Sequence, residues 1–150
     1  MTQHMPEQEQ SYAKHTKLVP LFHFFLLPLI LLTLVGSLVN LYHSLGDHER
    51  IYNASLITAI SVALLLLGFL ARVFALTAQD RAIRAEENMR HYLLAGRPLD
   101  TRLTVKQIVG LRFASDSELV DLARKAAEGG ISPDAIKKSV KFWRPDHDRL

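Results

Sequence analysis

The side chains with the greatest capacity for chemistry gather in one short polar segment. It contains four of them, His43, Asp47, His48 and Glu49. Imidazole and carboxylate groups are ligands for zinc and other transition metals. The spacing here is irregular, however, and polar residues are expected at this place in any case because the segment separates two apolar runs. We keep a metal site as an alternative and predict no metal ligand.

No other pattern in the chain is typical of an active site. The absence of Cys excludes disulfides, thiolate nucleophiles and thiolate metal sites. The chain has no Walker loop, no HExxH motif and no G-x-S-x-G motif. Neither apolar run carries the acidic residue expected of a proton or cation pathway. We therefore predict a protein that is not an enzyme, with no catalytic or cofactor-binding residue and no small-molecule substrate.

The charge of the chain is nearly balanced. There are 18 Lys and Arg residues and 15 Asp and Glu residues, a formal net charge of +3. A surplus of this size gives a mild attraction for anionic surfaces. No groove-reading motif accompanies it, so we predict no nucleic-acid partner.

The first apolar run is long enough to cross a bilayer. It extends from Leu18 to Leu41, and about 20 apolar residues cross a hydrocarbon core of ~30 Å. We predict a first transmembrane helix over residues 18–43, after an N-terminal cytoplasmic tail of residues 1–17. A cleaved secretory signal is the alternative, but the run far exceeds an apolar region of about 7 to 15 residues. Pro28 lies inside the run and predicts a kink.

The second apolar run predicts a second transmembrane helix over residues 54–76. Its one charged residue is Arg72, about one turn from the cytoplasmic end. The long stem of Arg72 can carry the guanidinium to the headgroup region. The alternative is a polar contact between Arg72 and His23 of the first helix.

The distribution of basic residues predicts the orientation of the two spans. Residues 44–53 form an external loop that is too short for a domain, so the helices are expected to make a tight antiparallel hairpin. The segments on the other side of the spans carry Lys14, Lys17, Arg72, Arg81, Arg84 and Arg90, whereas the loop carries only Arg50. Because cytoplasmic segments are enriched in Lys and Arg, both termini should face the cytoplasm.

The second span is expected to continue into the cytoplasm as a helical extension over residues 77–96, because no Gly or Pro interrupts the chain between Phe69 and Ala95. One face repeats mostly small residues at spacings of three and four, the rhythm of a packed helix seam. We call it the alanine seam: Gly68, Ala71, Ala75, Ala78, Ala82, Ala85, Met89 and Tyr92. The alternative is chance, since alanine is a common helix former. The opposite side is expected to be an ordinary solvated face, with Asp80, Arg81, Arg84, Glu87 and Arg90.

Residues 97–150 predict a small C-terminal cap of three short helices. Thr104 with Gln107 and Ser115 with Glu118 have capping-box spacing, and Ser132 precedes Pro133 as an N-cap. Pro145 is expected to end the third helix. Three stripes predict a common core: Val105, Ile108 and Val109; Leu119, Leu122 and Ala126; Ile136, Val140 and Trp143. The predicted fold class is an all-α membrane protein, in which a two-helix transmembrane hairpin carries a cytoplasmic extension and this cap.

The last helix of the cap should place Lys137, Lys141 and Arg144 beside its apolar stripe. This is the arrangement of a basic amphipathic helix, which can contact anionic lipid headgroups. The alternative is a docked helix with a solvated basic side.

Several stretches together resemble a family of small uncharacterised bacterial membrane proteins with two predicted transmembrane helices, a domain of unknown function. They are SYAKHTKLVPLFHF, ARVFALTAQDRAIR, LTVKQIVGLRFASDSEL and KKSVKFWRPDHDRL, of which QDRAIR and LRFASD are the most specific. The resemblance covers nearly the whole chain from Ser11. It implies a location in the bacterial inner membrane, as a multi-pass protein, and it implies no activity and no site residues.

Two functional hypotheses follow from these patterns. The first is a membrane-anchored interaction or scaffold protein whose cytoplasmic helices dock another membrane protein or a second copy of the chain, with the lipid bilayer as its other partner. The second is a subunit of an oligomeric small channel or a transporter accessory. It is motivated by polar residues in the outer halves of the spans: Thr33, Ser37, Asn40, Ser55, Thr58 and Ser61.

Overall fold

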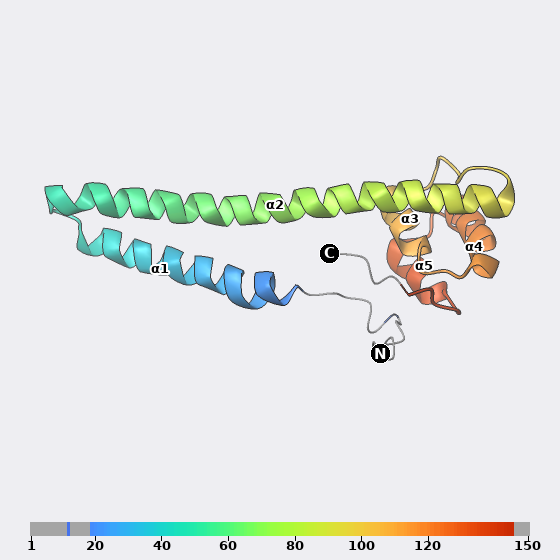
Figure 1. Cartoon of the computed structure of the whole chain (residues 1–150), viewed down its shortest axis with the longest axis horizontal. Helices are drawn as coiled ribbons and strands as arrows, with labels where there is room; N and C mark the ends of the chain where they lie inside the picture. Colours follow the sequence, from blue (N-terminus) through green and yellow to red (C-terminus); the bar gives the residue numbers. More distant parts are fainter. Residues whose placement is uncertain (1–11, 13–18, 146–150) are drawn as a thin grey trace, which may run out of the picture. The chain divides into compact units, whose positions relative to one another are not determined.

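A computed structural model describes Tyr12 and residues 19–145 of the chain, and in these residues the fold is all-helical (Figure 1). The elements in chain order are a π-helical segment Leu21–Leu26, α1 Leu27–His43, α2 His48–Ala95, α3 Val105–Leu111, α4 Asp116–Gly129 and α5 Pro133–Ser139. These residues form no strand, and extended pairing is limited to one bridge between Ala114 and Trp143. They divide into two compact units, one within Leu18–Leu76 and the other containing Thr77–Leu150.

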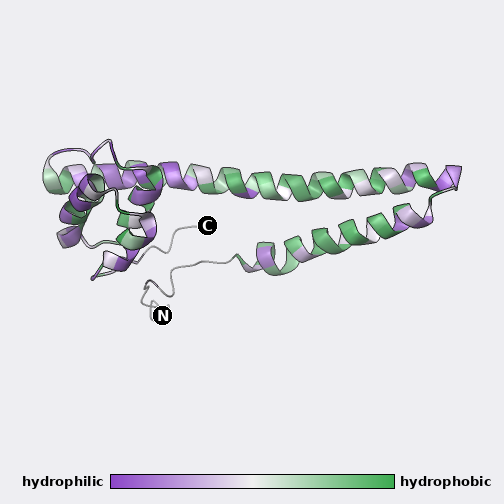
Figure 2. Cartoon of the chain, turned by 180° about the vertical axis from the view of Figure 1, so that it is seen from behind, coloured by the Kyte–Doolittle hydropathy of each residue, from purple (hydrophilic) through white to green (hydrophobic). Residues whose placement is uncertain are grey.

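Two helices are long and apolar enough to cross a membrane by length and composition. They are Leu21–His43, which joins the π-helical segment to α1, and α2. Figure 2 shows hydrophobic residues along α1 and much of the N-terminal half of α2, while α3, α4 and α5 mix hydrophilic and hydrophobic residues. The apolar stretches thus separate from the charged part of the chain, as the sequence pattern predicts.

The first helix changes its hydrogen-bonding pattern where Pro28 was expected to disturb it. Residues Leu21–Leu26 are π-helical, and the regular α-helix starts at Leu27 with Pro28 in its first turn. Pro28 has no N–H, so a regular helix through this point would leave a carbonyl one turn earlier without its usual donor. A π-helical turn is one way to absorb such an interruption.

The connection between the two long helices is shorter than the sequence pattern predicts. α2 begins at His48, so residues 48–53 are helical and only 44–47 form the turn. The carboxylate of Asp47 explains the early start, because its Oδ1 accepts hydrogen bonds from the backbone N–H groups of Glu49 and Arg50. This is an N-cap, which satisfies donors that have no partner inside the helix.

Within the first unit, the contacts of α1 and the π-helical segment with α2 include those of Ser37, Ile30 and Phe22. The hydroxyl of Thr58 donates to the carbonyl of Ser37 at 3.2 Å. A Cβ at Gly68 would lie 3.8 Å from the side chain of Ile30. The guanidinium of Arg72 lies 5.9 Å from the ring centroid of Phe22.

The alternative prediction for Arg72 is a contact with His23, but in the structure its guanidinium contacts the neighbouring residue Phe22. Arg72 lies over the ring of Phe22, the residue before His23. The Nδ1 of His23 lies 2.9 Å from the carbonyl oxygen of Val19. The guanidinium therefore contacts an aromatic face, which attracts a cation.

The second unit has one apolar core built from the three short helices and the chain before them. Its buried members are Leu99, Leu103, Ile108, Leu111, Ala114, Leu119, Ala123, Ala126, Ile136 and Val140. The predicted stripes thus supply five core residues, while Val105 and Val109 are only half-buried. Leu99 and Leu103 precede the first helix of the cap, where no helical periodicity marks them.

Two of the three predicted helix starts are confirmed in full. Thr104 and Gln107 form a reciprocal capping box, and the hydroxyl of Ser132 accepts from the N–H of Ala135. The capping box at Ser115 is wrong, because the Ser115 side chain accepts no hydrogen bond from a backbone N–H of α4. The Ser115 hydroxyl instead donates to the carboxylate of Glu118 at 3.4 Å, and this carboxylate also has distant partners. It accepts hydrogen bonds from the backbone N–H groups of Lys141 and Phe142.

The last helix ends six residues before the predicted stop at Pro145. α5 ends at Ser139, and Val140 is already extended. The chain then pairs with the segment before α4: the N–H of Arg144 donates to the carbonyl of Phe113 at 2.8 Å, and Ser115 donates to Phe142 at 3.1 Å. These bonds, together with those to Glu118, replace the helical bonds that residues 140–143 would make.

Candidate functional site

The C-terminal part of α2, within the second unit, buries a charged face against the cap. Ile83, Glu87 and His91 recur at intervals of four and are all buried. The sequence pattern assigns Glu87 and Arg90 to a solvated face, which is wrong. Charged residues were expected to face water because burying them is costly unless each is paired.

Glu87 is the centre of an ion-pair cluster between α2 and the cap. Its side chain is only 6% exposed, and its two carboxylate oxygens lie 2.9 Å from Arg90 Nη1 and 3.4 Å from Arg144 Nη1. Arg90 also contacts the carboxylate of Asp116 at 2.6 Å and donates to the carbonyl of Ala114 at 2.7 Å. The cluster therefore ties α2 to the start of α4 and to the C-terminal segment.

Two further contacts fix the chain where it leaves α2. The amide oxygen of Asn88 accepts from the N–H of Leu99 at 2.9 Å, and Nδ1 of His91 lies 2.9 Å from the carbonyl oxygen of Arg97. Gly96 has φ +67°, and its N–H donates to the carbonyl of Tyr92 at 2.8 Å. A glycine in the left-handed region ends the helix without strain.

The alanine seam lies on the side of α2 away from Glu87, and its members in the second unit stay exposed. Ala78, Ala82 and Ala85 are exposed, Met89 is 61% exposed and Tyr92 is 53% exposed. In the first unit, Ala71 is exposed, and Gly68 and Ala75 are half-buried. The packing of a partner helix on this seam stays a prediction.

The three basic residues expected on one face of the last helix are not on one helix. Lys137 is in α5 with its Nζ 5.9 Å from the ring centroid of Phe113, whereas Arg144 pairs with Glu87 beyond the end of the helix. Lys141 is exposed in the segment after α5. The amphipathic helix is therefore wrong, and contact with an anionic surface stays a prediction without that helical basis.

The polar segment from His43 to Glu49 takes a structural role at Asp47, which caps α2 and pairs with Arg50 at 3.3 Å. Across Tyr12 and residues 19–145, no three His, Asp or Glu side chains are placed to share a metal ion. The segment is thus accounted for by the start of a helix.

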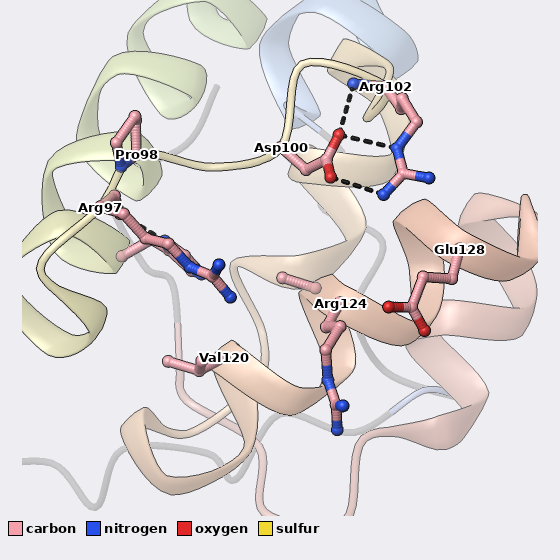
Figure 3. A pocket seen from close by; sticks show the side chains of 9 residues that line it. Arg97, Pro98, Asp100, Arg102, Val120, Arg124 and Glu128 are labelled. Carbon is pink, nitrogen blue, oxygen red and sulfur yellow. Dashed lines mark hydrogen bonds and ion pairs between the residues drawn. The ribbon is translucent and has the colours of Figure 1, made fainter.

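A pocket in the second unit was missed by the sequence analysis. It has a volume of about 460 Å³ and lies between the end of α2, the chain after it and α4 (Figure 3). Its lining residues are His91, Arg97, Pro98, Asp100, Arg102, Val120, Ala123, Arg124 and Glu128. They span 38 positions with no short motif; the only local signal is the density of arginine around Pro98.

Asp100 and Arg102 form a closed pair at one side of this pocket. The carboxylate of Asp100 accepts from Nε of Arg102 at 3.0 Å, from its Nη2 at 2.7 Å and from its backbone N–H at 2.9 Å. The hydrogen bonds from Arg102, with its charge, lower the pKa of Asp100 to about 2. The bidentate geometry commits this guanidinium to its carboxylate.

Comparison with other proteins identifies a family and no activity. No curated protein and no solved structure matches the chain. Residues 5–150 match a family of unknown function, DUF6526. The match includes α1, α2 and the whole cap. The chain therefore belongs to the DUF6526 family.

Proposed function

We propose that the chain is a membrane-anchored interaction protein, in which a transmembrane hairpin holds the cap at the cytoplasmic surface and the alanine seam joins two copies. The bilayer placement is supported by the large apolar side chains exposed on the first unit, such as Phe24, Leu32 and Phe69. In water this much contiguous apolar exposure would favour aggregation. Lipid accommodates it at no cost.

The antiparallel hairpin is supported by the order of the contacts between α1 and α2. Ser37 meets Thr58, Ile30 meets Gly68, and Phe22 meets Arg72. The partner of each later residue in α2 is an earlier residue of the first helix. With the excess of Lys and Arg outside the turn, this pairing favours both termini on the cytoplasmic side.

One observation supports self-association: the cap covers one face of α2 and leaves the opposite face uncovered. The cap packs on Ile83, Glu87 and His91, so the part of the alanine seam in the second unit, from Ala78 to Tyr92, keeps its side chains exposed. Small residues permit a close approach of two backbones, and Met89 and Tyr92 at the end of the seam would gain apolar contacts. A second copy presents the same seam, so a two-fold arrangement of the pair is self-complementary.

The channel hypothesis has less support. The hydroxyls of Thr33, Ser37, Ser55, Thr58 and Ser61 each donate to a carbonyl of their own helix. Ser37 and Ser61 are also buried. Groups that are satisfied within the helix and covered by it are poorly placed to line a water-filled path.

Cysteine crosslinking in membranes tests the seam. The natural chain has no Cys, so Ala78→Cys or Ala85→Cys introduces one thiol. We expect oxidation to give a homodimer with either variant, because a close seam brings each residue near its copy. Arg84→Cys is the matched control, since Arg84 is exposed on α2 but lies off the seam. Equal crosslinking of Arg84→Cys, no dimer with either seam variant, or crosslinks to other proteins alone would contradict self-association.

Labelling of single cysteines in intact cells tests the orientation. A membrane-impermeant maleimide is expected to react with Leu45→Cys, because Leu45 is 61% exposed in the turn between the spans. Lys125→Cys in α4 should react only after the cells are permeabilised. The reverse pattern would exclude the proposed topology.

A further inference from the structure

We propose that the pocket between the end of α2, residues 97–102 and α4 binds the phosphoryl group of a small phosphate monoester, with Arg97 and Arg124 as its anion-binding residues. This goes beyond self-association and does not depend on it. The pocket volume of about 460 Å³ is in the range of small-molecule sites and is larger than a phosphate ion alone would fill. Pro98, Val120 and Ala123 supply apolar wall for an organic part.

Arg97 and Arg124 are the two arginines available to a ligand. Arg102 is committed to Asp100 by two side-chain hydrogen bonds. No residue among Tyr12 and 19–145 forms an ion pair with Arg97. Arg124 pairs with Asp121 at 3.2 Å, but both side chains are mostly exposed, and such pairs contribute little and reorient readily.

The two guanidinium groups come from different elements. Figure 3 shows the side chain of Arg97 extending from the chain after α2 toward α4, and the side chain of Arg124 extending from α4 away from Arg97. The exposed side chain of Arg124 therefore has to turn for both arginines to contact one ligand. Arginine forks match the oxygens of phosphate, and two of them from separate elements can contact different oxygens of one group. A carboxylate, with two oxygens, uses such an arrangement less fully.

His91 adds a positioned polar group at the pocket. It is buried, and when its Nδ1 donates to the carbonyl of Arg97 its Nε2 carries a lone pair. Nε2 can therefore accept a hydrogen bond from a phosphate hydroxyl. The same hydrogen bond fixes the backbone of Arg97, so the anion-binding side chain starts from an anchored position.

Glu128 narrows the class of ligand. The lining holds three guanidinium groups and two carboxylates, one net positive charge apart from His91. A polyphosphate would meet repulsion from Glu128, whereas a monoester with an amine or hydroxyl on its organic part would satisfy this carboxylate. Phosphoethanolamine is the simplest probe with both features.

Calorimetry on the full chain in phosphatidylcholine nanodiscs tests the proposal with phosphoethanolamine as the probe. We expect one site per chain, and Arg97→Ala and Arg124→Ala should each weaken binding by about tenfold, the loss of one charged hydrogen-bonding group. Lys125→Ala is the matched control: Lys125 is next to Arg124, exposed, and outside the pocket. His91→Asn keeps a donor near the carbonyl of Arg97 but removes Nε2, and it should weaken binding while the fluorescence of Trp143 stays unchanged.

A phosphate monoester can come from a soluble molecule or from a lipid headgroup, so a second arm adds phosphatidic acid to the nanodiscs. If phosphoethanolamine binds with the expected variant pattern and phosphatidic acid does not compete, the source is soluble; if phosphatidic acid competes, it is the lipid. The proposal would be overturned if titration with phosphoethanolamine gave no heat of binding and the heats measured in nanodiscs with and without phosphatidic acid did not differ. Equal weakening by Lys125→Ala would also overturn it, because the attraction would then be diffuse.

Discussion

Glu87→Ala is expected to weaken the attachment of the cap to α2 by about 3 kcal/mol, the cost of breaking a buried ion pair. The side chain of Arg90 is only 13% exposed, so its charge would remain buried with Asp116 as its remaining carboxylate partner. Arg144 is half-exposed and can turn to water, so its share of the loss is small. The main cost therefore comes from Arg90.

The single Trp of the chain makes this effect measurable. Trp143 packs against Phe113, with ring centroids 4.8 Å apart, so loss of the cap should shift its emission to longer wavelength. In a urea titration of the full chain in detergent, Glu87→Ala should unfold the cap at lower denaturant. Glu86→Ala removes the same charge from the neighbouring exposed position and should leave the midpoint nearly unchanged. Equal midpoints for both variants would show that the ion-pair cluster does not hold the cap.

Phe113→Ala is expected to destabilise the cap by about 3 to 5 kcal/mol, the range for removing a buried aromatic side chain. Phe113 is fully buried. Its ring contacts Trp143 and lies 4.6 Å from the guanidinium carbon of Arg112. Because a domain of this size has only a few kcal/mol of net stability, the cap of this variant should be largely unfolded at 25 °C.

Amide hydrogen exchange in the intact protein checks this prediction. Protection in α3, α4 and α5 should be lost in Phe113→Ala, while the apolar part of α2 stays protected. Phe142→Ala removes the same side chain from a position that is 68% exposed and should keep the protection. A protected cap in Phe113→Ala would mean that the aromatic pair is not part of what holds the core.

Features encoded over a few residues could be predicted from the sequence. Each of the two apolar runs is continuous in the sequence, and its length alone indicates a helix that could cross a membrane. The capping box at Thr104 and the N-cap at Ser132 involve partners three residues away. The pair Ser115 and Glu118 has the same spacing, but the carboxylate of Glu118 accepts from the Ser115 hydroxyl and from the backbone N–H groups of Lys141 and Phe142, more than twenty residues further on. The local rule failed there because distant donors competed for the carboxylate.

The miss at Glu87 has a related cause. A helix face with Glu and Arg three residues apart has the appearance of a solvated surface, and nothing near Glu87 in the sequence points to Arg144, 57 residues away. Likewise, the periodicity of residues 133–143 continues as a helical stripe, yet α5 ends at Ser139 because the following residues pair with 113–115. The predicted basic stripe therefore extends past the end of α5, and Lys141 and Arg144 lie outside that helix.

By itself the sequence determined the helical class, the two apolar helices and most of the helix starts, because hydropathy, helix propensity and capping act between residues close in the chain. Only the tertiary structure decided which face of α2 the cap covers, where the last helix ends and that His91, Arg97 and Arg124 line one pocket. Those outcomes depend on contacts between residues tens of positions apart. Their free energy appears only when the chain has folded and the buried charges have found their partners.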